Sequence, residues 1–452
     1  MKAIFRIGEV VATTLLLLAP ALWNGFPFLQ YDTGGYLARW FEGYLVPSRS
    51  TVYGLFAVAG WPLDFWPEVL VQAAVAVWII SLMLRVYGLR DRPLALLGTV
   101  TALAATTSLP WLAGILLTDI FAGTAVLALH LLLFAPASLG RWESAGLVLL
   151  VGFAGATHSA TLAVLMAIVA AAGLARLYRR DLLPLPALGR GAGALALAAA
   201  MLLGTNFALS GQFAWTPGGY GIVFARMMED GIVARYLDDH CPDARLRLCP
   251  YRHRLPRTAD EFLWSKGPFD ELGRFAGLGG EMRTIVLESL AEYPGMQIET
   301  AVNAAARQLV KVESGEGVLT TIWHTYGIIE RYLPSVVPAM RAARQQHGEV
   351  SFRALNDVQV PVALISMLLL PVILLAGRGE YGDLRLLAAT VIVALLANAV
   401  VCGVLSNPHD RYGARLAWIA TFAVALVPMR AAATRRPQAT VAVEGSGWAN
   451  NS

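Results

Sequence analysis

The sequence predicts an all-α polytopic membrane protein with about ten transmembrane helices. The first observation is composition: of 452 residues, 57% are hydrophobic and only 15% are charged, and the mean hydropathy is +0.57. Soluble domains carry close to a quarter charged residues, so a chain this apolar needs lipid as its solvent. The second observation is a series of long apolar runs, at 7–24, 66–84, 93–109, 117–136, 144–175, 190–209, 357–376, 384–405 and 414–430.

Basic residues between the runs predict how each run crosses the membrane, because Lys and Arg are enriched in cytoplasmic loops. The net charge of +4 belongs to this pattern, so we do not assign it to nucleic-acid binding. The residues that mark the cytoplasmic side are Lys2, Arg6, Arg85, Arg90, Arg92, Arg141, Arg176, Arg179, Arg180, Arg378, Arg385, Arg430, Arg435 and Arg436.

Two runs decide the helix count. The first resembles a signal peptide, but no small-x-small cleavage site precedes WNGFPFLQYD, so we expect an uncleaved first helix. The run at 144–175 lies between two basic loops, so the chain must cross an even number of times there. Two short helices that turn at GATHSAT satisfy this condition and leave both termini in the cytoplasm. The excess of Arg over Lys is typical of a GC-rich bacterium, which places the chain in an inner membrane with its outer side in the periplasm.

The runs divide the chain into four parts. Residues 1–210 form an N-terminal transmembrane module that includes the first periplasmic loop and an interfacial helix. Residues 211–356 form a long periplasmic segment that is mostly helical, since MRTIVLESLAEY and QIETAVNAAARQLVKV have apolar residues at helical spacing. Residues 357–432 form the C-terminal transmembrane helices, and 433–452 form a disordered cytoplasmic tail.

The three cysteines fall in two environments. Cys402 lies in an apolar run, where a buried and inert thiol is expected. Cys241 and Cys249 lie in the long polar segment and are too far apart for a Cys-x-x-C redox motif. In an oxidising compartment such a pair forms a disulfide. The alternative is two unrelated free thiols.

The first external loop contains an acidic residue beside aromatic residues. Asp32 precedes a segment with Tyr36 at helical spacing, which indicates a helix that lies along the membrane surface. Charges near membrane depth are functional candidates, but Asp is also a good helix N-cap, and both interpretations stay open here. Arg49 lies close to the membrane re-entry, where it could contact lipid headgroups or bind a phosphate.

Further polar residues lie on the same predicted side. Asp119 precedes an apolar run and could also be an N-cap, and His158 lies at the tip of the hairpin, where a lone His is more often structural. His409, Arg411 and Tyr412 precede the last run in a loop that could be an ordinary polar loop. Their shared side is the stronger argument, because an outer cavity with carboxylates and cations fits a phosphate-bearing donor and a hydroxyl acceptor.

These motifs make the chain resemble the GT-C superfamily of membrane glycosyltransferases. The similarity covers mainly the first 180 and the last 60 residues. The matching residues are Asp32 in QYDTGGYL, Arg49 in SRSTVYGLF, Asp119 in LLTDIFAG, and Arg411 and Tyr412 in PHDRYGAR. The chain departs from the family where Thr33 follows Asp32 in place of a second acid, where Ser50 and Thr51 replace prolines after Arg49, and in having fewer helices than most members.

The resemblance implies inverting transfer of a sugar from a polyprenyl-phosphate-linked donor to a glycan or lipid acceptor. In this reaction Asp32 would be the general base, while Arg49 and Arg411 would hold the leaving phosphate. Asp119 and His158 would orient the acceptor or assist proton transfer. A divalent metal between Asp32, Asp119 and His158 would fit, but no spacing requires one, so we predict that no cofactor is required. The expected catalytic residues are Asp32 and Asp119, and the expected substrate-binding residues are Arg49, Tyr36, His158, His409, Arg411 and Tyr412.

Three other functions fit parts of the pattern. A lipid-linked glycan ligase or polymerase would also use outward Arg and His residues, but it needs no carboxylate base at Asp32. A transporter or flippase would place ionisable residues near the bilayer midplane, often with internal repeats, and the sequence shows neither. A non-catalytic membrane scaffold would use the aromatic loop as an anchor and Asp32 as a helix cap.

Overall fold

The computed structural model describes residues 2–89, 92, 94–216, 218–377 and 379–434, and it is all-helical over those residues, without a strand. Seven described helices are long and apolar enough to cross a membrane, which fits the predicted multi-pass membrane protein. They are α1 (Lys2–Asn24), α4 (Trp66–Val86), α9 (Ser159–Tyr178), α10 (Leu185–Ser210), α19 (Arg353–Ala376), α20 (Gly382–Leu405) and α21 (Asp410–Thr434). Arg90, Arg378, Arg435, Arg436 and most of the predicted tail lie outside the described residues.

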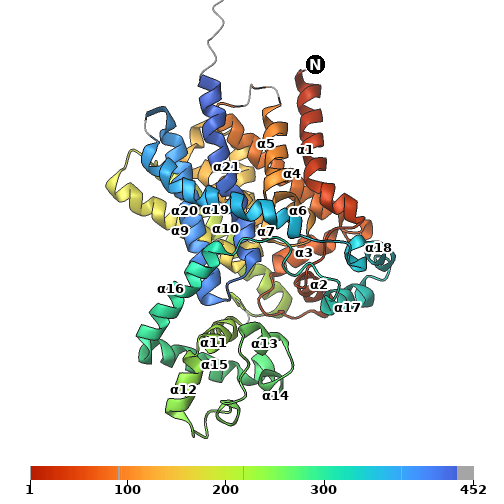
Figure 1. Cartoon of the computed structure of the whole chain (residues 1–452), viewed down its shortest axis with the longest axis vertical. Helices are drawn as coiled ribbons and strands as arrows, with labels where there is room; N and C mark the ends of the chain where they lie inside the picture. Colours follow the sequence, from red (N-terminus) through yellow and green to blue (C-terminus); the bar gives the residue numbers. More distant parts are fainter. Residues whose placement is uncertain (1, 90–91, 93, 217, 378, 435–452) are drawn as a thin grey trace, which may run out of the picture.

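The remaining apolar runs form shorter helices, so the full count of ten spans stays a prediction. These helices are α5 (Ala95–Thr106), α7 (Asp119–Phe134) and α8 (Arg141–Thr157), with 12, 16 and 17 residues. The run at 144–175 is divided as expected from GATHSAT: α8 ends and α9 begins at His158, whose backbone is extended. The start of α1 and the end of α21 lie at the same end of the helical body (Figure 1).

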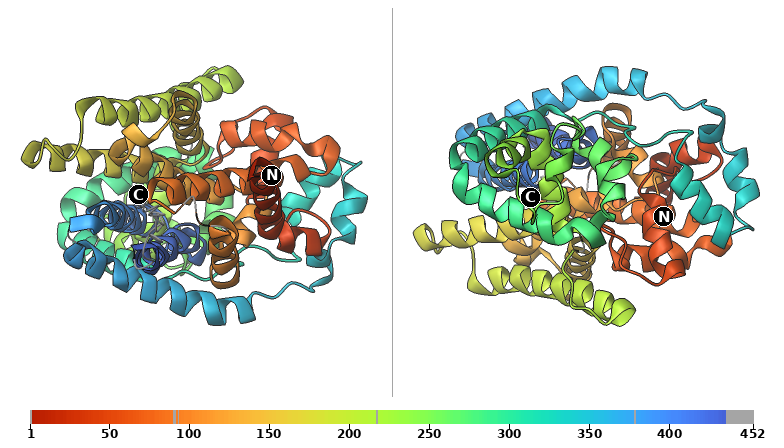
Figure 2. Two further views of the ribbon diagram at one scale, coloured as in Figure 1. Left: turned by 90° about the horizontal axis from the view of Figure 1, so that it is seen from above. Right: turned by 90° about the horizontal axis from the view of Figure 1, so that it is seen from below.

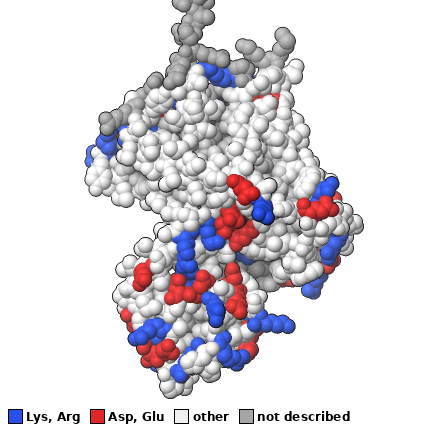
Figure 3. Space-filling view, viewed as in Figure 1, with Lys and Arg blue, Asp and Glu red and all other residues white. Residues whose placement is uncertain are grey.

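Charged side chains are distributed unevenly over the molecule. Figure 3 shows a helical body whose visible face is almost free of Lys, Arg, Asp and Glu, above a lower part that is rich in them. An apolar belt of this kind is what a helical bundle exposes to lipid. Large exposed apolar side chains on the candidate spans agree with it, for example Leu15, Leu174, Leu368 and Val400.

The lower part is a helical domain with its own core. It consists of α11 (Gly219–Glu229), α12 (Ile232–His240), α13 (Ala259–Trp264), α14 (Pro268–Glu271) and α15 (Arg274–Glu292), which lie below the helical body (Figure 1). Phe224, Leu237 and Ile285 are fully buried in this second core. Cys241 and Cys249 are joined in a disulfide at its edge, which confirms the predicted pairing. Cys402 is a buried free thiol.

The rest of the central segment returns to the helical body. α16 (Pro294–Val310) packs on α20, and α17 (Trp323–Tyr332) packs on α2 (Thr33–Glu42) of the first loop. Figure 2 shows α17 and α18 (Val337–Ala342) beside the N-terminal helices, away from the lower domain. The other described helices are α3 (Thr51–Ala59), α6 (Leu109–Gly114) and the 3-10 turns at Trp61–Leu63, Pro136–Ser138, Cys249–Tyr251, Arg344–His347 and Gly379–Tyr381.

Backbone contacts fix the first loop against the segment that precedes α7. The Phe28 amide donates to the Gly114 carbonyl at 2.9 Å, and the Leu116 amide donates to the Phe28 carbonyl at 2.9 Å. On the other side, a Cβ added at Gly34 would lie 2.6 Å from the Thr325 Cα on α17, so only glycine allows this approach. The start of α2 is therefore held between α17 and the segment that precedes α7.

Candidate functional site

Asp32 is buried at the start of α2, but its side chain makes no capping hydrogen bond to that helix. One carboxylate oxygen accepts from Arg49, and the other accepts from Arg411 Nη1 at 2.5 Å. The simple capping interpretation therefore does not account for this side chain. Two cations from opposite ends of the chain converge on it instead.

Asp119 is the first residue of α7, and its carboxylate is also bound by α21. Arg411 Nε donates to Asp119 Oδ2 at 2.6 Å, so one guanidinium joins both predicted catalytic acids. Arg415 Nη1 lies 3.9 Å from Asp119 Oδ1. Arg411 and Arg415 are four residues apart, which places both on one face of α21. Arg415 was not among the residues predicted from the sequence, although its spacing within PHDRYGAR is the signal that could have identified it.

Burial and neighbouring charges shift the pKa of Asp32 in opposite directions. Burial raises the pKa of the Asp32 carboxyl, but Arg49 and Arg411 outweigh it and hold the pKa below its usual value. Asp32 is consequently an ionised carboxylate at neutral pH. It can accept hydrogen bonds strongly, but it is a weak base for as long as both cations stay in contact.

Glu316 is a further acid that the sequence analysis did not identify. Its Oε2 accepts from the Arg411 backbone amide at 2.8 Å. It is flanked by Gly315 and Gly317, both with positive φ, and a Cβ at Gly317 would lie 2.3 Å from the Gln30 side chain. The two glycines let this loop lie directly against the first loop, and the pattern Gly-Glu-Gly was the available signal.

His409 connects the site to the lower domain. Its Nδ1 lies 2.5 Å from Glu316 Oε1, and its Nε2 lies 3.6 Å from Asp260 Oδ2 on α13. Burial lowers the pKa of the His409 imidazole, but the hydrogen bond and charge of Glu316, with the charge of Asp260, raise it above its usual value. The imidazole therefore lies between two acids from separate parts of the central segment, and both favour its protonated form.

The aromatic side chains complete the cluster. The Tyr412 ring lies 6.5 Å from the His158 ring and 5.5 Å from the His409 ring, measured between centroids. The Arg49 guanidinium carbon lies 5.8 Å from the centroid of the Tyr36 ring. The structure thus brings all eight residues singled out from the sequence into one connected group.

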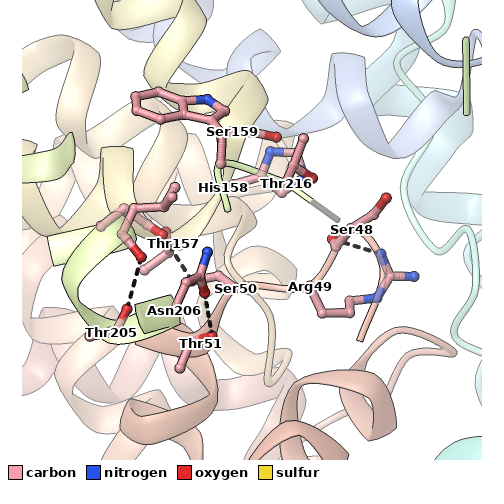
Figure 4. Close-up of a pocket in the computed structure, with 13 residues that line it drawn as sticks. Ser48, Arg49, Ser50, Thr51, Thr157, His158, Ser159, Thr205, Asn206 and Thr216 are labelled. Carbon is pink, nitrogen blue, oxygen red and sulfur yellow. Dashed lines mark hydrogen bonds between the residues drawn. The ribbon is translucent and has the colours of Figure 1, made fainter. Parts of the chain in front are cut away.

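A small pocket that is open to solvent lies beside this group (Figure 4). Arg49 and Ser48 lie on one side of it in Figure 4, and Thr157, Thr205 and Asn206 lie on the other. His158 also lines it, and His158 Nδ1 is buried without a hydrogen-bond partner in the described structure. Trp215 contributes an aromatic ring to the same pocket. Hydroxyl groups, one amide and an exposed indole are a suitable lining for a polar ligand such as a sugar.

The described residues contain no group of three or more His, Cys, Asp or Glu side chains that could hold a metal ion. Both candidate acids are bound by arginines instead. Comparisons of the chain with protein-family models, with curated proteins and with solved structures find no match. Function is therefore inferred from the chemistry of this chain's own residues.

Proposed function

We propose that this protein is an inverting membrane glycosyltransferase that moves a sugar from a polyprenyl-phosphate-linked donor to a glycan or lipid acceptor. The observation that carries the proposal is the binding of Asp32 by both Arg49 and Arg411 beside the hydroxyl-lined pocket. A buried carboxylate provides a proton acceptor, and the two guanidinium groups match the charge of a phosphate leaving group. The reaction takes place on the periplasmic side of a bacterial inner membrane.

In the proposed mechanism the donor phosphate takes the place of Asp32 as the partner of the two arginines. Arg49 and Arg411 then hold the phosphate through charge-assisted hydrogen bonds. Without these cations the pKa of Asp32 rises under the effect of burial, so the carboxylate becomes a stronger base. Donor binding would in this way activate the base.

The transfer step follows from this arrangement. The acceptor oxygen attacks the anomeric carbon on the face opposite the phosphate, and its proton passes to Asp32. The bond between the anomeric carbon and the phosphate oxygen breaks, and the phosphate leaves with the electron pair. Arg49 and Arg411 stabilise the charge that develops on the phosphate. Asp119 keeps Arg411 in position, and His158 and Tyr412 orient the acceptor.

A lipid-linked glycan ligase or polymerase is the second candidate. It is favoured by the fact that both Asp32 oxygens accept from arginines in the free protein, which lowers the basicity of Asp32. In a ligase the same arginines would bind the donor phosphate, and Asp32 would only hold them in position. The two candidates differ in whether the carboxylate charge is needed for the chemical step.

The test compares Asp32→Asn with wild type in purified membranes, following release of polyprenyl phosphate from a panel of lipid-linked sugars. We expect Asp32→Asn to lose roughly 10²–10⁴-fold in turnover with donor binding retained, because the amide cannot take a proton. Asp64→Asn is the matched control: it makes the same change in the same loop, at a left-handed backbone position that suits Asn. Equal turnover by Asp32→Asn and wild type would favour the ligase. No turnover by wild type on any donor would count against both candidates.

A further inference from the structure

The pocket between Arg49 and His158 has a basic lining, although Arg49 itself is paired with Asp32 outside the lining. Its described lining includes an arginine and a histidine but no Asp or Glu. A further cation lies directly behind its wall: Arg39 of α2 is fully buried, and its Nη1 donates to Thr51 at 2.8 Å and to Asn206 at 3.5 Å. Thr51 and Asn206 both line the pocket and are hydrogen-bonded to each other at 2.6 Å.

Arg39 differs from the other buried arginines in its partners. Arg411, Arg415 and Arg226 each have a carboxylate within 4 Å. Arg39 forms no ion pair with any described residue; its remaining bond goes to the Val46 carbonyl, and its Nε has no partner. Burial lowers the pKa of the Arg39 guanidinium to about 10, so it is charged at neutral pH. A buried cation without a counter-ion is costly, which indicates that an anion completes the site.

Two helices begin at the same pocket. Ser50 and Thr51 are the N-cap and first residue of α3, and His158 and Ser159 occupy the same positions in α9. The His158 side chain does not cap α9. The first amides of a helix and its dipole favour an anion at this end. The Ser50 side chain already caps α3 by accepting from the Tyr53 amide, and α8 ends at Thr157 on the same pocket. The uncapped start of α9, together with Arg49 and Arg39, is therefore what favours an anion here.

We propose that this pocket binds a phosphate group, carried by a lipid-linked substrate or free in solution. Arg49 contacts the phosphate directly, and the amide groups at the start of α9 donate to it. Arg39 acts through Thr51 and Asn206 as a buried counter-charge. The proposal shares a phosphate-bearing ligand with the proposed function, but it does not depend on sugar transfer.

The sharpest test places an internal counter-ion beside Arg39. Asn206→Asp is nearly isosteric and adds a carboxylate at the atom that accepts from Arg39. We expect it to weaken phosphate binding roughly tenfold or more, because the new charge pairs with Arg39 and repels the ligand. Asn398→Asp is the matched control, since Asn398 also donates to a backbone carbonyl and accepts from a buried arginine, Arg415, outside the pocket. It should change binding by no more than about twofold.

The measurement is equilibrium binding of radiolabelled polyprenyl phosphate to the purified full chain in detergent. Unlabelled polyprenol, polyprenyl phosphate and inorganic phosphate serve as competitors. Displacement by inorganic phosphate would show that the phosphate group suffices. Displacement by polyprenyl phosphate but not by inorganic phosphate would assign the site to a lipid-borne phosphate. Either displacement result supports the proposal, provided that Asn206→Asp weakens binding. Equal competition by polyprenol, or equal effects of Asn206→Asp and Asn398→Asp, would overturn it.

A second variant covers the case in which Asn206→Asp does not fold. Ser159→Asp adds an acid at an exposed position in the first turn of α9, where acids stabilise helices. It should fold and still weaken phosphate binding, and normal binding would overturn the proposal. The two proposals also fail separately. If the wild type has no transferase activity but the pocket variants lose phosphate binding, the phosphate site stands and the proposed function fails. If the wild type is an active transferase but the pocket variants bind phosphate normally, the phosphate site fails.

Discussion

Two buried arginines of this protein are each bound by two carboxylates, but the origins of those carboxylates differ. Arg226 of the lower domain contacts Glu229 at 3.3 Å and Asp230 at 2.5 Å, both on its own helix or at its end. Arg411 contacts Asp32 and Asp119, which are 379 and 292 positions away in the chain. Local pairs at three and four residues stabilise a helix wherever that helix packs. Pairs from three distant segments exist only when the whole fold assembles, and this is typical of a site.

The environments of the two clusters differ in the same way. Glu229 and Asp230 keep 24% and 10% of their side-chain surface exposed, so water can take over part of the role of Arg226. Asp32 and Asp119 keep 8% and 3%, so they depend on Arg411. Arg226 does not line the pocket, whereas Asp32 shares Arg49 with it. A buried arginine is therefore a functional candidate when its partner acids come from distant segments and are themselves buried.

The largest expected effect comes from Arg411→Met. It leaves two buried carboxylates without their main cation, which should lower the free energy of unfolding by about 3–5 kcal/mol and abolish sugar transfer. Arg226→Met is the matched change in the lower domain: it should lower stability less and leave transfer per folded molecule unchanged. Thermal unfolding in detergent and the transfer assay measure both. Loss of transfer to the same extent in both variants would contradict the distinction.

A smaller effect is expected from the pH dependence of the contact between His409 and Glu316. The raised pKa of His409 means that its charge stabilises the fold fully below the usual value of 6.5, and that this contribution is lost as the pH rises through the raised pKa. The lowered pKa of Glu316 means that its contribution is present above 4.5 and is lost only in stronger acid. Asp260 and Arg411 are the other charges that face His409.

The variant His409→Gln measures this contribution. The difference in the free energy of unfolding between wild type and His409→Gln should be largest between pH 4.5 and 6.5, at about 1–2 kcal/mol. It should become smaller in alkaline buffer. The difference in the free energy of unfolding between wild type and Glu316→Gln should also become smaller in alkaline buffer, since this variant removes the partner acid. A difference that stays constant from pH 4.5 into alkaline buffer would mean that the imidazole packs as a neutral group.

The smallest effect is expected from the exposed pair of Arg179 and Asp181. Their side chains are 63% and 67% exposed, at a contact of 2.9 Å. Solvent and salt screen such a pair, so Asp181→Asn should not change the unfolding midpoint measurably. This variant completes the series from a distant buried pair to a local exposed one. A shift as large as that of His409→Gln would show that burial does not determine the ranking.

Much of the fold could be predicted from local sequence. The apolar runs predicted the helices, the GATHSAT sequence predicted the break at His158, and the cysteine pair predicted the disulfide. The candidate acids and cations were found because charges are rare in so apolar a chain. Glu316 and Asp260 were missed because the central segment contains many charges, and apart from the Gly-Glu-Gly pattern nothing local shows which of them reach the site. Arg415 was missed although its four-residue spacing from Arg411 places both on one helix face.

The sequence by itself determined the class of the protein, because hydrophobic length, charge and cysteine position act locally along the chain. It determined that Asp32, Asp119 and Arg411 were candidates, but not that one guanidinium joins them. Only the tertiary structure decided which charges have partners, and Arg39, unremarkable in the sequence, is the buried cation without an acid in the described structure. The physical reason is that the cost of burying a charge depends on the groups around it, and those groups come from segments hundreds of residues apart.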